Sequence, residues 1–491
     1  MRHIAPLLAL LGATAASPLS ADRTAALLDC LTAAGVPVDE VGSAEYKLDA
    51  TGFNLALNYT PAAVAAVTTA EHIRDAVTCA RELGFKATPK CGGHSYANFG
   101  LGGEDGHLVI EMSRFNKVVL DPETGIATAQ GGTRLGHFAW EVYNQGKRAI
   151  SHGTCPGVGA GGHVLHGGFG MSSHTRGLAS DWLVGATVLL ANSTFVNCSE
   201  TENPDLFWAL RGAGGSMGVV TEFRFKTFEV PETVTFFVAS VQWPTEERAF
   251  AGLKAAQEFA DTMAPELNMR LFIAKRFVNF EGLYHGNRAG LQEALAPLLK
   301  ATGAVLAMAR EGNWVDQARH FGGMTNIDQQ HGHEDHDTFF STSLYTKALS
   351  DDKLQTFVSY WFRQAKASPR DWYVQIDFHG GKTSAVSKPD RDYTAYAYRD
   401  ALFLFLLYDR VDDGHAFPAD GHELMSDLVN NITHGLSRDD WGMYINYPNH
   451  RLSQDEAQVN YWGRHLPKLQ AIKKAVDPED LFHFPQGVLP A

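Results

Sequence analysis

The sequence predicts an α+β protein of two domains, one of them discontinuous along the chain. With 491 residues, the chain is long enough for two or three units of the usual domain size. From Pro231 to about residue 436, long strand-like stretches alternate with helical ones, a pattern typical of an antiparallel sheet covered by helices. Residues 22–228 contain shorter strands and helices instead, and no internal repeat is present.

The first unit is expected to open with an amphipathic helix over 70–83, whose apolar residues share one face. Further on, two strand-like stretches (183–190 and 194–197) flank a turn with the sequence Ala-Asn-Ser, which predicts a β-hairpin. The other elements predicted here are strands over 86–89, 109–112, 118–121, 126–129 and 218–228, and a helix over 203–210.

The second unit is expected to contain a helix over 246–263 between long strands. After it, a helix is predicted over 455–476, ending at an Asp-Pro step. The strands predicted in this part lie over 233–242, 268–274, 279–284, 372–378 and 402–408.

Composition excludes some partners. The formal net charge of -14 argues against nucleic acid and against an anionic membrane surface. A basic start, a short apolar run and small residues at 1–21 predict a secretory signal too short to span a bilayer, and no other stretch is long enough to do so. We therefore expect a secreted protein. Four glycosylation sequons agree with secretion: Asn58, Asn192, Asn197 and Asn431.

Two glycine-rich segments carry most of the functional information. The first contains Gly-Gly-His-Ser-Tyr with His94, and the second contains Thr-Cys-Pro-Gly-Val-Gly-Ala-Gly-Gly-His with Cys155. Glycine permits close approach of a ligand to the backbone, so such runs usually wrap a ligand rather than fill a core. Each segment also presents one nucleophilic side chain.

These two segments, in this order, resemble the bicovalent flavoproteins of the vanillyl-alcohol-oxidase/p-cresol-methylhydroxylase superfamily, in its berberine-bridge-enzyme-like branch. The resemblance extends over nearly the whole chain and is greatest to fungal oligosaccharide oxidases. It implies that FAD is bound covalently, with His94 on the 8α-methyl carbon and Cys155 on C6 of the flavin. It further implies an FAD-binding domain over 22–228, a substrate-binding domain over 229–436 and a segment over 437–491 that returns to the FAD domain. Additional cofactor-binding residues are expected at Gly92, Gly93, Ser95, Val158, Gly159, Gly162, His163, Gly218 and Val220.

The resemblance also assigns the chemistry. The second tyrosine of Tyr-x-Asn-Tyr, Tyr447, is expected to take the proton of the substrate hydroxyl, although its phenol must then titrate well below its usual pKa. Asp377 is its expected hydrogen-bond partner. Tyr373 and Gln375 share a strand face with Asp377, because side chains alternate along a strand. With Tyr96 of the flavin loop, these two are the expected substrate-binding residues.

The implied reaction is oxidation of the anomeric hydroxyl at the reducing end of an oligosaccharide to a lactone, which hydrolyses to the aldonic acid, while dioxygen is reduced to hydrogen peroxide. Where glucooligosaccharide oxidase carries Gln, this chain has Leu406, so the preferred sugar stays open. In this family the residue three after the linked cysteine, here Val158, controls the access of dioxygen. A related oxidoreductase or dehydrogenase acting on another alcohol, such as an aromatic one, is the alternative. We expect a monomer.

Two other motifs suggest different functions. Residues 157–162 satisfy the dinucleotide fingerprint G-x-G-x-x-G, but the strand before it and the helix after it that the fingerprint needs are not predicted. Ser216 satisfies G-x-S-x-G, the nucleophile elbow of serine hydrolases, yet it follows a helix and precedes a strand, the reverse of an elbow. We expect Ser216 to lie in a turn whose amides face the flavin phosphates, with a serine hydrolase as a remote alternative.

The remaining cysteines and histidines have structural interpretations. Cys30 and Cys79 lie in amphipathic helical stretches, and the resemblance supports a disulfide between them; Cys91 and Cys198 are expected to be free, buried thiols. A group of acidic and histidine residues over 331–336 lacks the spacing of a metal motif and is expected to be a polar loop, and no metal is expected.

Overall fold

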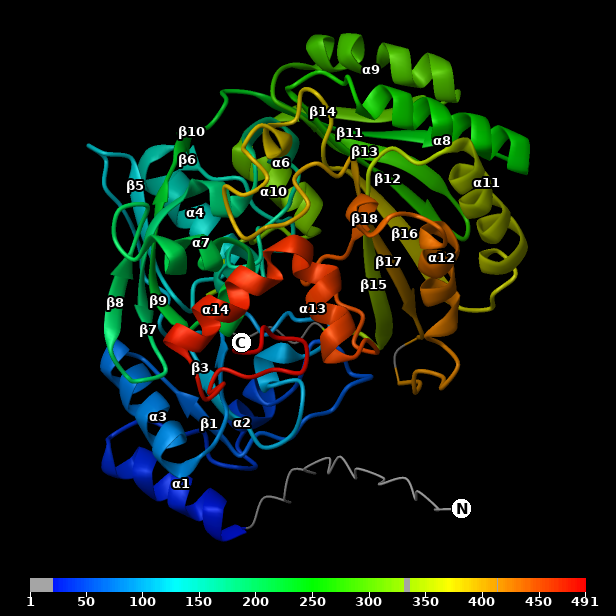
Figure 1. The fold of residues 1–491 in the computed structure, drawn as a ribbon. Helices are drawn as coiled ribbons and strands as arrows, with labels where there is room; N and C mark the ends of the chain where they lie inside the picture. Colours follow the sequence, from blue (N-terminus) through cyan, green and yellow to red (C-terminus); the bar gives the residue numbers. More distant parts are fainter. Residues whose placement is uncertain (1–20, 331–335, 413) are drawn as a thin grey trace, which may run out of the picture.

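The computed structural model describes residues 21–330, 336–412 and 414–491. Within these residues the chain forms three larger sheets and one two-stranded ribbon, with helices on their outer faces (Figure 1). The predicted signal and the predicted loop at 331–335 lie outside the described residues. Of the loop group only His336 is described; its Nδ1 lies 2.9 Å from the carbonyl oxygen of Gly52.

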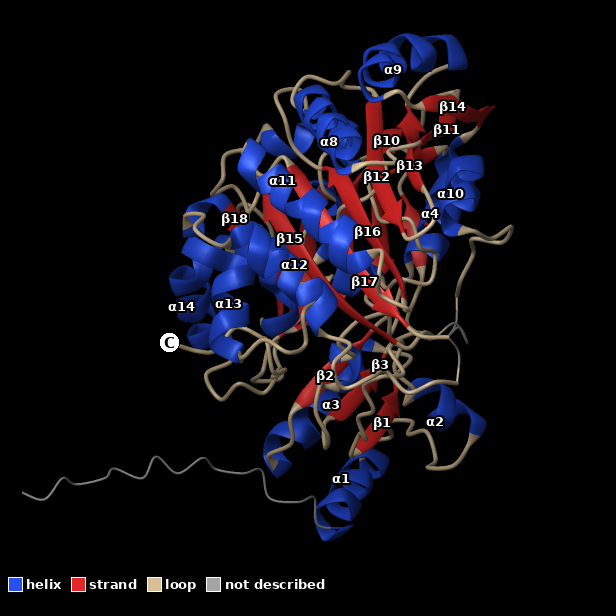
Figure 2. Cartoon of the chain, turned by 90° about the vertical axis from the view of Figure 1, so that its right-hand side faces the viewer, coloured by secondary structure: helices blue, strands red, loops and turns tan. Residues whose placement is uncertain are grey.

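The first sheet along the chain is small and parallel. Its strands were predicted in part from the sequence, but their parallel pairing was not. Its order is β1–β3–β2, with β1 at Ala63–Ala66, β2 at Ala87–Lys90 and β3 at Leu108–Glu111. Figure 2 shows this sheet apart from the large one, next to α1 (Ala21–Ala33) and α3 (Ala70–Leu83). The amide of His72 donates to the N-cap hydroxyl of Thr69, and α3 ends at Gly84 in the left-handed conformation, φ 69°.

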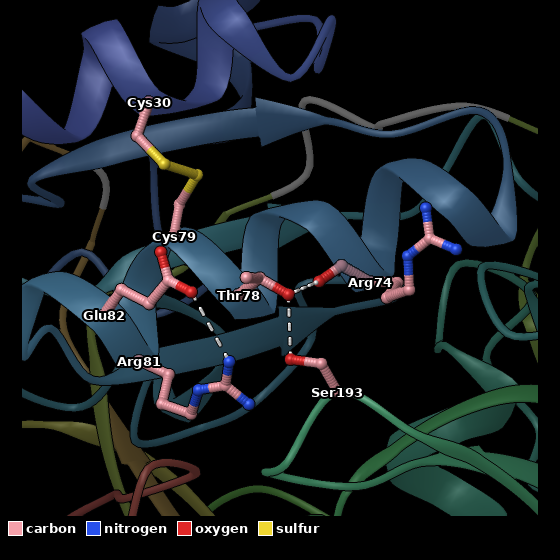
Figure 3. The surroundings of a disulfide bond; sticks show 7 residues. All are labelled: Cys30, Arg74, Thr78, Cys79, Arg81, Glu82 and Ser193. Atoms are coloured by element: carbon pink, nitrogen blue, oxygen red, sulfur yellow. Dashed lines mark hydrogen bonds and ion pairs between the residues drawn. A yellow bond between two sulfur atoms is a disulfide. The ribbon is translucent and has the colours of Figure 1, made fainter.

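The predicted disulfide is present between α1 and α3. Cys30 and Cys79 have Cα atoms 5.9 Å apart (Figure 3). On the same helix the Thr78 hydroxyl donates to Ser193 Oγ over 2.8 Å, and Ser193 belongs to the turn of the predicted hairpin. The helix therefore joins the parallel sheet to the sheet that follows.

The second sheet is antiparallel, in the order β4–β5–β9–β7–β8. The predicted hairpin is confirmed, since β7 pairs with β8 from Ala186 opposite Cys198 to Leu189 opposite Phe195. The strands are β4 (Val118–Leu120), β5 (Ile126–Gln130), β7 (Leu183–Leu189), β8 (Phe195–Cys198) and β9 (Val219–Lys226); the ribbon is β6 (Arg148–Ala149) with β10 (Phe228–Glu229); the helices of this part are α2 (Ala44–Asp49), α4 (Leu135–Gly146), α5 (Ala160–Val164), α6 (Ser173–Arg176) and α7 (Pro204–Ala213).

The third sheet has eight antiparallel strands in the order β14–β11–β13–β12–β16–β17–β15–β18, which confirms the predicted antiparallel sheet. Helices cover one face, as Figure 2 shows for α8, α11 and α12 in front of the strands. The strands are β11 (Val234–Val241), β12 (Leu267–Ala274), β13 (Val278–Tyr284), β14 (Val305–Gly312), β15 (Phe339–Thr346), β16 (Asp371–Phe378), β17 (Phe403–Arg410) and β18 (Trp441–Gly442); the helices are α8 (Glu246–Ala260), α9 (Arg288–Thr302), α10 (Trp314–Gly322), α11 (Asp351–Tyr360) and α12 (Glu423–Thr433).

The two faces of this sheet differ because side chains alternate along each strand. Leu271, Ile376 and Phe405 point into a fully apolar layer beneath α8 and α11. Residues one position away on the same strands, such as Arg270 and Gln375, face the first unit instead. The sheet thus offers a polar surface to the rest of the molecule.

The C-terminal segment joins the two units. It begins as β18 at the edge of the large sheet, and α14 (Leu466–Val476) later packs against α7 of the first unit (Figure 1). The single helix predicted over 455–476 is wrong: α13 (Gln454–Trp462) and α14 are separate. Gly463, with φ 46° and ψ −122°, breaks the helical path, and Pro467 then starts the new helix without needing an amide donor.

No helix among the described residues is long and apolar enough to cross a membrane. The side chains of all four sequon asparagines are exposed: Asn58, Asn192, Asn197 and Asn431.

Candidate active site

The two glycine-rich loops touch through their backbones. One follows β2 and carries His94, and the other precedes α5 and carries Cys155. A Cβ atom added to Gly92 would lie 2.2 Å from the amide nitrogen of Gly159, and one added to Gly159 would lie 2.4 Å from that of Gly92. Only glycine fits at either position, because a side chain would push the loops apart. Segments far apart in the sequence are thereby held together.

Both loops border one cavity of about 250 Å³. On its other side the cavity reaches the polar face of the eight-stranded sheet and the C-terminal segment. Among the predicted catalytic, cofactor-binding and substrate-binding residues, Tyr373 does not line this cavity. Those found in the wall are His94, Cys155, Gly92, Gly93, Ser95, Val158, Gly159, Gly162, His163, Gly218, Val220, Tyr96, Gln375, Asp377 and Tyr447.

Cys155 differs from the other free cysteines. Its thiol opens into the cavity and is exposed there, although it lies deep in the protein, where burial raises its pKa above the usual value. Cys91 and Cys198 are buried, as predicted, and their thiols donate to the carbonyl oxygens of Thr133 and Ala186. Cys91 also borders the cavity, but it is 8% exposed and its thiol is turned to Thr133, so Cys155 is the more accessible thiol there.

A second histidine, His163, lies in the same wall as Cys155 and His94. His163 Nε2 accepts a hydrogen bond from the amide of Gly153 over 2.9 Å, which fixes the loop just before the cysteine. Burial lowers the pKa of His163 to about 3, so its imidazole is neutral. His94 itself stacks on Phe53, with ring centroids 4.0 Å apart and an angle of 28° between the planes.

A row of polar side chains lines the cavity from the eight-stranded sheet. Arg270 on β12 is paired in register with Asp377 on β16. The guanidinium donates to Glu281 over 2.5 Å and to the amide oxygen of Gln375 over 2.9 Å, and the Gln375 amide donates to Asp377 over 2.9 Å. No sequence motif identified Arg270. The signal available was a charged residue within a largely apolar strand, with Glu281 on the next strand.

The Tyr-x-Asn-Tyr segment is fixed to β15 by two serines. The hydroxyl of Ser343 accepts from the amide of Tyr444 over 2.9 Å, and the hydroxyl of Ser341 donates to the carbonyl oxygen of Pro448 over 2.9 Å. The Asn446 side chain donates to the Tyr444 hydroxyl, and its carbonyl oxygen lies 3.0 Å from His166 Nδ1. Both tyrosines therefore have defined positions.

Tyr447 lies in the cavity wall between two other tyrosines. Its ring is stacked near Tyr96, with centroids 5.9 Å apart, and meets Tyr444 edge-on at 5.2 Å. Burial, followed by the charge of Asp377, raises the pKa of the Tyr447 phenol well above its usual value, while Arg270 opposes the shift. The expected lowering of this pKa is thus not produced by the described protein groups, because burial outweighs the opposing charge of Arg270.

Asp377 affects the pKa of Tyr447 through its charge, and not through a hydrogen bond to the phenol. Its carboxylate accepts from Gln375, and no hydrogen bond to Tyr447 is found in the described part of the chain. Burial raises its pKa to about 6, although Arg270 and Gln375 stabilise the ionised form. A carboxyl with this pKa changes its protonation state in weakly acidic solution.

Ser216 has a structural role. It is 1% exposed, and its hydroxyl accepts from the amide of Val488 in the C-terminal segment over 3.0 Å. Its carbonyl oxygen accepts from Lys473, a fully buried lysine that also pairs with Asp477 and Asp480. As predicted, the serine lies between a helix and β9, and the turn contributes Gly215 and Gly218 to the cavity wall. A serine that is buried and bonded in this way is not placed to act as a nucleophile, which argues against the serine-hydrolase alternative.

Aromatic side chains continue from the cavity along the sheet. Tyr373 stacks on Tyr408, with centroids 4.9 Å apart, and on Phe272 at 4.7 Å, which places it beyond the polar row. Phe277, 48% exposed, stacks on Phe272 and ends the series at the surface.

The wall suits a large, anionic, planar cofactor. A Cβ added to Gly162 would meet nothing within 4 Å, so this backbone faces open space. Backbone amides in glycine-rich turns are suited to phosphate groups. Among the described residues that line the cavity, Asp377 is the one carboxylate. It lies on β16 of the large sheet and not on the glycine-rich loops. No group of three or more potential metal ligands occurs among the described residues.

Comparison with known proteins agrees with this arrangement. Residues 61–199 match the family model described as FAD binding domain, and residues 443–489 match that described as berberine and berberine like. Over 484 residues the chain is 49% identical to the xylooligosaccharide oxidase of Thermothelomyces thermophilus, covering 97% of each chain. The chain belongs to the FAD-dependent carbohydrate oxidases.

Solved structures of this oxidase family have the same fold. A xylooligosaccharide oxidase from Myceliophthora thermophila in complex with xylobiose superposes with a TM-score of 0.93 over 95% of this chain and 99% of its own. A chitooligosaccharide oxidase, 43% identical, gives a TM-score of 0.93 over 95% of this chain and all of its own. A glucooligosaccharide oxidase from Acremonium strictum is described with a 6-S-cysteinyl, 8α-N1-histidyl FAD; it is 43% identical, with a TM-score of 0.92 over 95% of this chain and 99% of its own.

Proposed function

We propose that the protein oxidises the anomeric hydroxyl at the reducing end of an oligosaccharide to a lactone and passes the electrons to dioxygen. The observation that carries this proposal is one cavity that joins His94 and Cys155 to Tyr447 and the polar row of the sheet. The lactone then hydrolyses to the aldonic acid in water. A sugar chain is the substrate class that the related oxidases share.

His94 and Cys155 are the proposed attachment points of FAD. Each is a nucleophile in the cavity wall, and the backbone contact between their loops fixes them relative to each other. The related glucooligosaccharide oxidase is described with one histidyl and one cysteinyl bond to its flavin, which matches this pair in residue types. When bound, the flavin accepts a hydride from the anomeric carbon.

Tyr447 is the proposed acceptor of the hydroxyl proton. Its high pKa disfavours a free phenolate, so the proton has to be shared with a second group. Asp377, with a pKa of about 6, is the adjacent base with capacity to take it. Arg270 balances the negative charge that develops on this pair, because it faces both residues from the neighbouring strand. Gln375 links the arginine to the carboxylate and can orient a sugar hydroxyl.

Dioxygen is the proposed electron acceptor. Val158 lies in the cavity wall three residues after Cys155, with its carbonyl oxygen held by the amide of Leu135 over 2.8 Å. A valine leaves space that a larger side chain at this fixed backbone position would fill. Tyr96 and Tyr373 are proposed to contact the sugar, since aromatic rings present apolar surface to sugar C–H groups.

A peroxide-release screen tests the proposal. Xylo-, chito-, cello- and malto-oligosaccharides are compared with aryl alcohols at equal concentration, and the oxidised sugar is identified by mass as the aldonic acid. Peroxide release from at least one oligosaccharide series, with an aldonic acid as product, is the expected result. Release from aryl alcohols alone would favour the alternative function. The secretory signal, the glycans and the monomeric state are further proposals, tested by sizing the protein from the culture medium before and after deglycosylation.

A further inference from the structure

A short segment of the first unit lies between the His94 loop and the large sheet. The amide of Leu55 donates to the carbonyl oxygen of Asp337 over 2.8 Å, and the amide of Asp337 donates to that of Phe53 over 3.0 Å. Residues 53–55 thus pair with the start of the substrate side of the molecule. We call Gly52–Leu55 the clasp.

Asn54 joins the clasp to both neighbours and is completely buried. Its side-chain amide donates to the carbonyl oxygens of Tyr96 over 2.9 Å and of Phe339 over 3.0 Å. Its backbone exchanges two hydrogen bonds with the side chain of Asn98, which is 1% exposed. The turn that follows His94 is therefore held at Tyr96 and Asn98 by one residue of the clasp.

Phe53, between these anchored positions, lies against His94. Its ring is stacked on the imidazole at 4.0 Å, and it also contacts Tyr96 at 5.7 Å and Phe339 edge-on at 5.9 Å. Phe53 thus covers one face of the imidazole, while His94 still lines the cavity. Because Asn54 fixes the chain beside it, the backbone of Phe53 cannot move away without breaking buried hydrogen bonds, and the ring is packed against Tyr96 and Phe339.

We propose that Phe53 is a positioning residue for the covalent attachment of flavin to His94. This inference rests on the proposed function, in which His94 forms one of the two bonds. Attachment would join an imidazole nitrogen to the flavin 8α carbon, with loss of one proton from the N–H and one from the C–H bond. The two electrons of the broken C–H bond would remain on the flavin, and dioxygen, the acceptor in the proposed reaction, would take them with two protons to give hydrogen peroxide.

The expected effect follows from the freedom of the imidazole. A histidine has three staggered positions about χ1 and roughly two about χ2, so an imidazole can choose among up to about six orientations. Stacking on Phe53 favours the one in which the His94 ring lies parallel to the Phe53 ring. Loss of the stack should therefore slow attachment at His94 about fivefold. Attachment at Cys155, which lies on the other loop, should not change.

The test compares Phe53→Leu with Phe53→Tyr in the full-length holoenzyme. Protein is harvested early and late in expression, digested, and the fraction of His94 and of Cys155 peptides carrying flavin is measured by mass spectrometry. We expect about fivefold less flavin on the His94 peptide of Phe53→Leu at the early harvest, a normal Cys155 peptide, and full rescue in Phe53→Tyr, which keeps the ring. Leu55→Ala, at a 42% exposed position of the clasp, is the matched control and should behave as the wild type.

The outcomes separate this inference from the proposal beneath it. Wild type with flavin on Cys155 alone would overturn both. Flavin on His94 at the wild-type level in Phe53→Leu would overturn only the role of Phe53. An equal loss of flavin from the His94 peptide in Phe53→Tyr would also overturn the role of Phe53, because that variant retains the stacked ring. If Phe53→Leu does not accumulate, Phe53→Met supplies the same comparison, since it keeps apolar volume without a ring.

Discussion

Replacing Asp377 with asparagine should make the protein more stable and less active. The carboxyl is 3% exposed, and burial raises its pKa from 3.8 to about 6. An acid whose pKa is raised by folding binds its proton more tightly in the folded than in the unfolded state. The free energy of unfolding therefore falls as the pH rises between these two values, by about 3 kcal/mol in total. Asparagine stays neutral and can still accept from Gln375, so Asp377→Asn escapes this loss.

Melting curves at two pH values measure the effect. For a chain of this length, 3 kcal/mol corresponds to roughly 3 °C in melting temperature. At pH 8 Asp377→Asn should melt about that much higher than the wild type, and at pH 4 the two should nearly coincide. Stopped-flow reduction by sugar should be about 10- to 100-fold slower in the variant at pH 8, because the proton of Tyr447 has lost its acceptor. The wild-type rate should rise with pH through about 6, and the variant's rate should not.

The matched control is Asp352→Asn, at an exposed position at the start of α11. It should leave both the reduction rate and the pH dependence of melting unchanged. A melting temperature for Asp377→Asn that falls below that of the wild type at pH 8 but not at pH 4 would refute the reasoning, because it would mean that the ionised carboxylate stabilises the fold. Normal reduction by sugar in that variant would exclude Asp377 from the proton transfer.

Four further outcomes are expected. Tyr447→Phe should fold normally and slow flavin reduction by at least about 100-fold in stopped flow; near-normal reduction would assign proton acceptance to another group. His94→Ala and Cys155→Ala should each keep one covalent bond, so denatured protein stays yellow, with a lower reduction potential by dye titration; flavin released completely from denatured wild type would contradict both bonds. Val158→Leu should slow reoxidation by dioxygen but not reduction by sugar, and equal reoxidation rates would remove Val158 from that role. Cys30→Ala should cost roughly 4 kcal/mol in the chain-entropy model, seen as a lower melting temperature, and an unchanged one would show that the helices need no bridge.

Local patterns made most of the fold predictable. The hairpin at 183–197 and the strands over 268–284 have continuous apolar or alternating patterns that few other structures satisfy. β14 was missed because its Ala, Met, Arg and Glu residues favour helix, yet pairing with β11 places it at the edge of the sheet. The helix over 455–476 was predicted too long, since a single glycine with an unusual backbone conformation cannot be recognised from composition.

Residues of the candidate site could be predicted where they belong to a recognisable sequence motif. His94 and Cys155 stand in contiguous glycine-rich runs, and Tyr447 ends a short recognisable segment. Arg270 depends on the register between β12 and β16, which no local pattern contains. Phe53 depends on the pairing of residues 53–55 with Asp337, a contact between segments that are distant in sequence.

The position of Tyr447 on the segment that joins the two units has a consequence for biosynthesis. The ribosome completes both glycine-rich loops early, but it makes this tyrosine only near the end of the chain. The segment must then add β18 to the large sheet and dock α14 on α7 before the phenol reaches the cavity. With Tyr447 as the proposed proton acceptor, a chain that has not yet reached this segment lacks that group. Oxidation of sugar should therefore begin only after the segment has been made and docked, so the fold sets the moment at which activity appears.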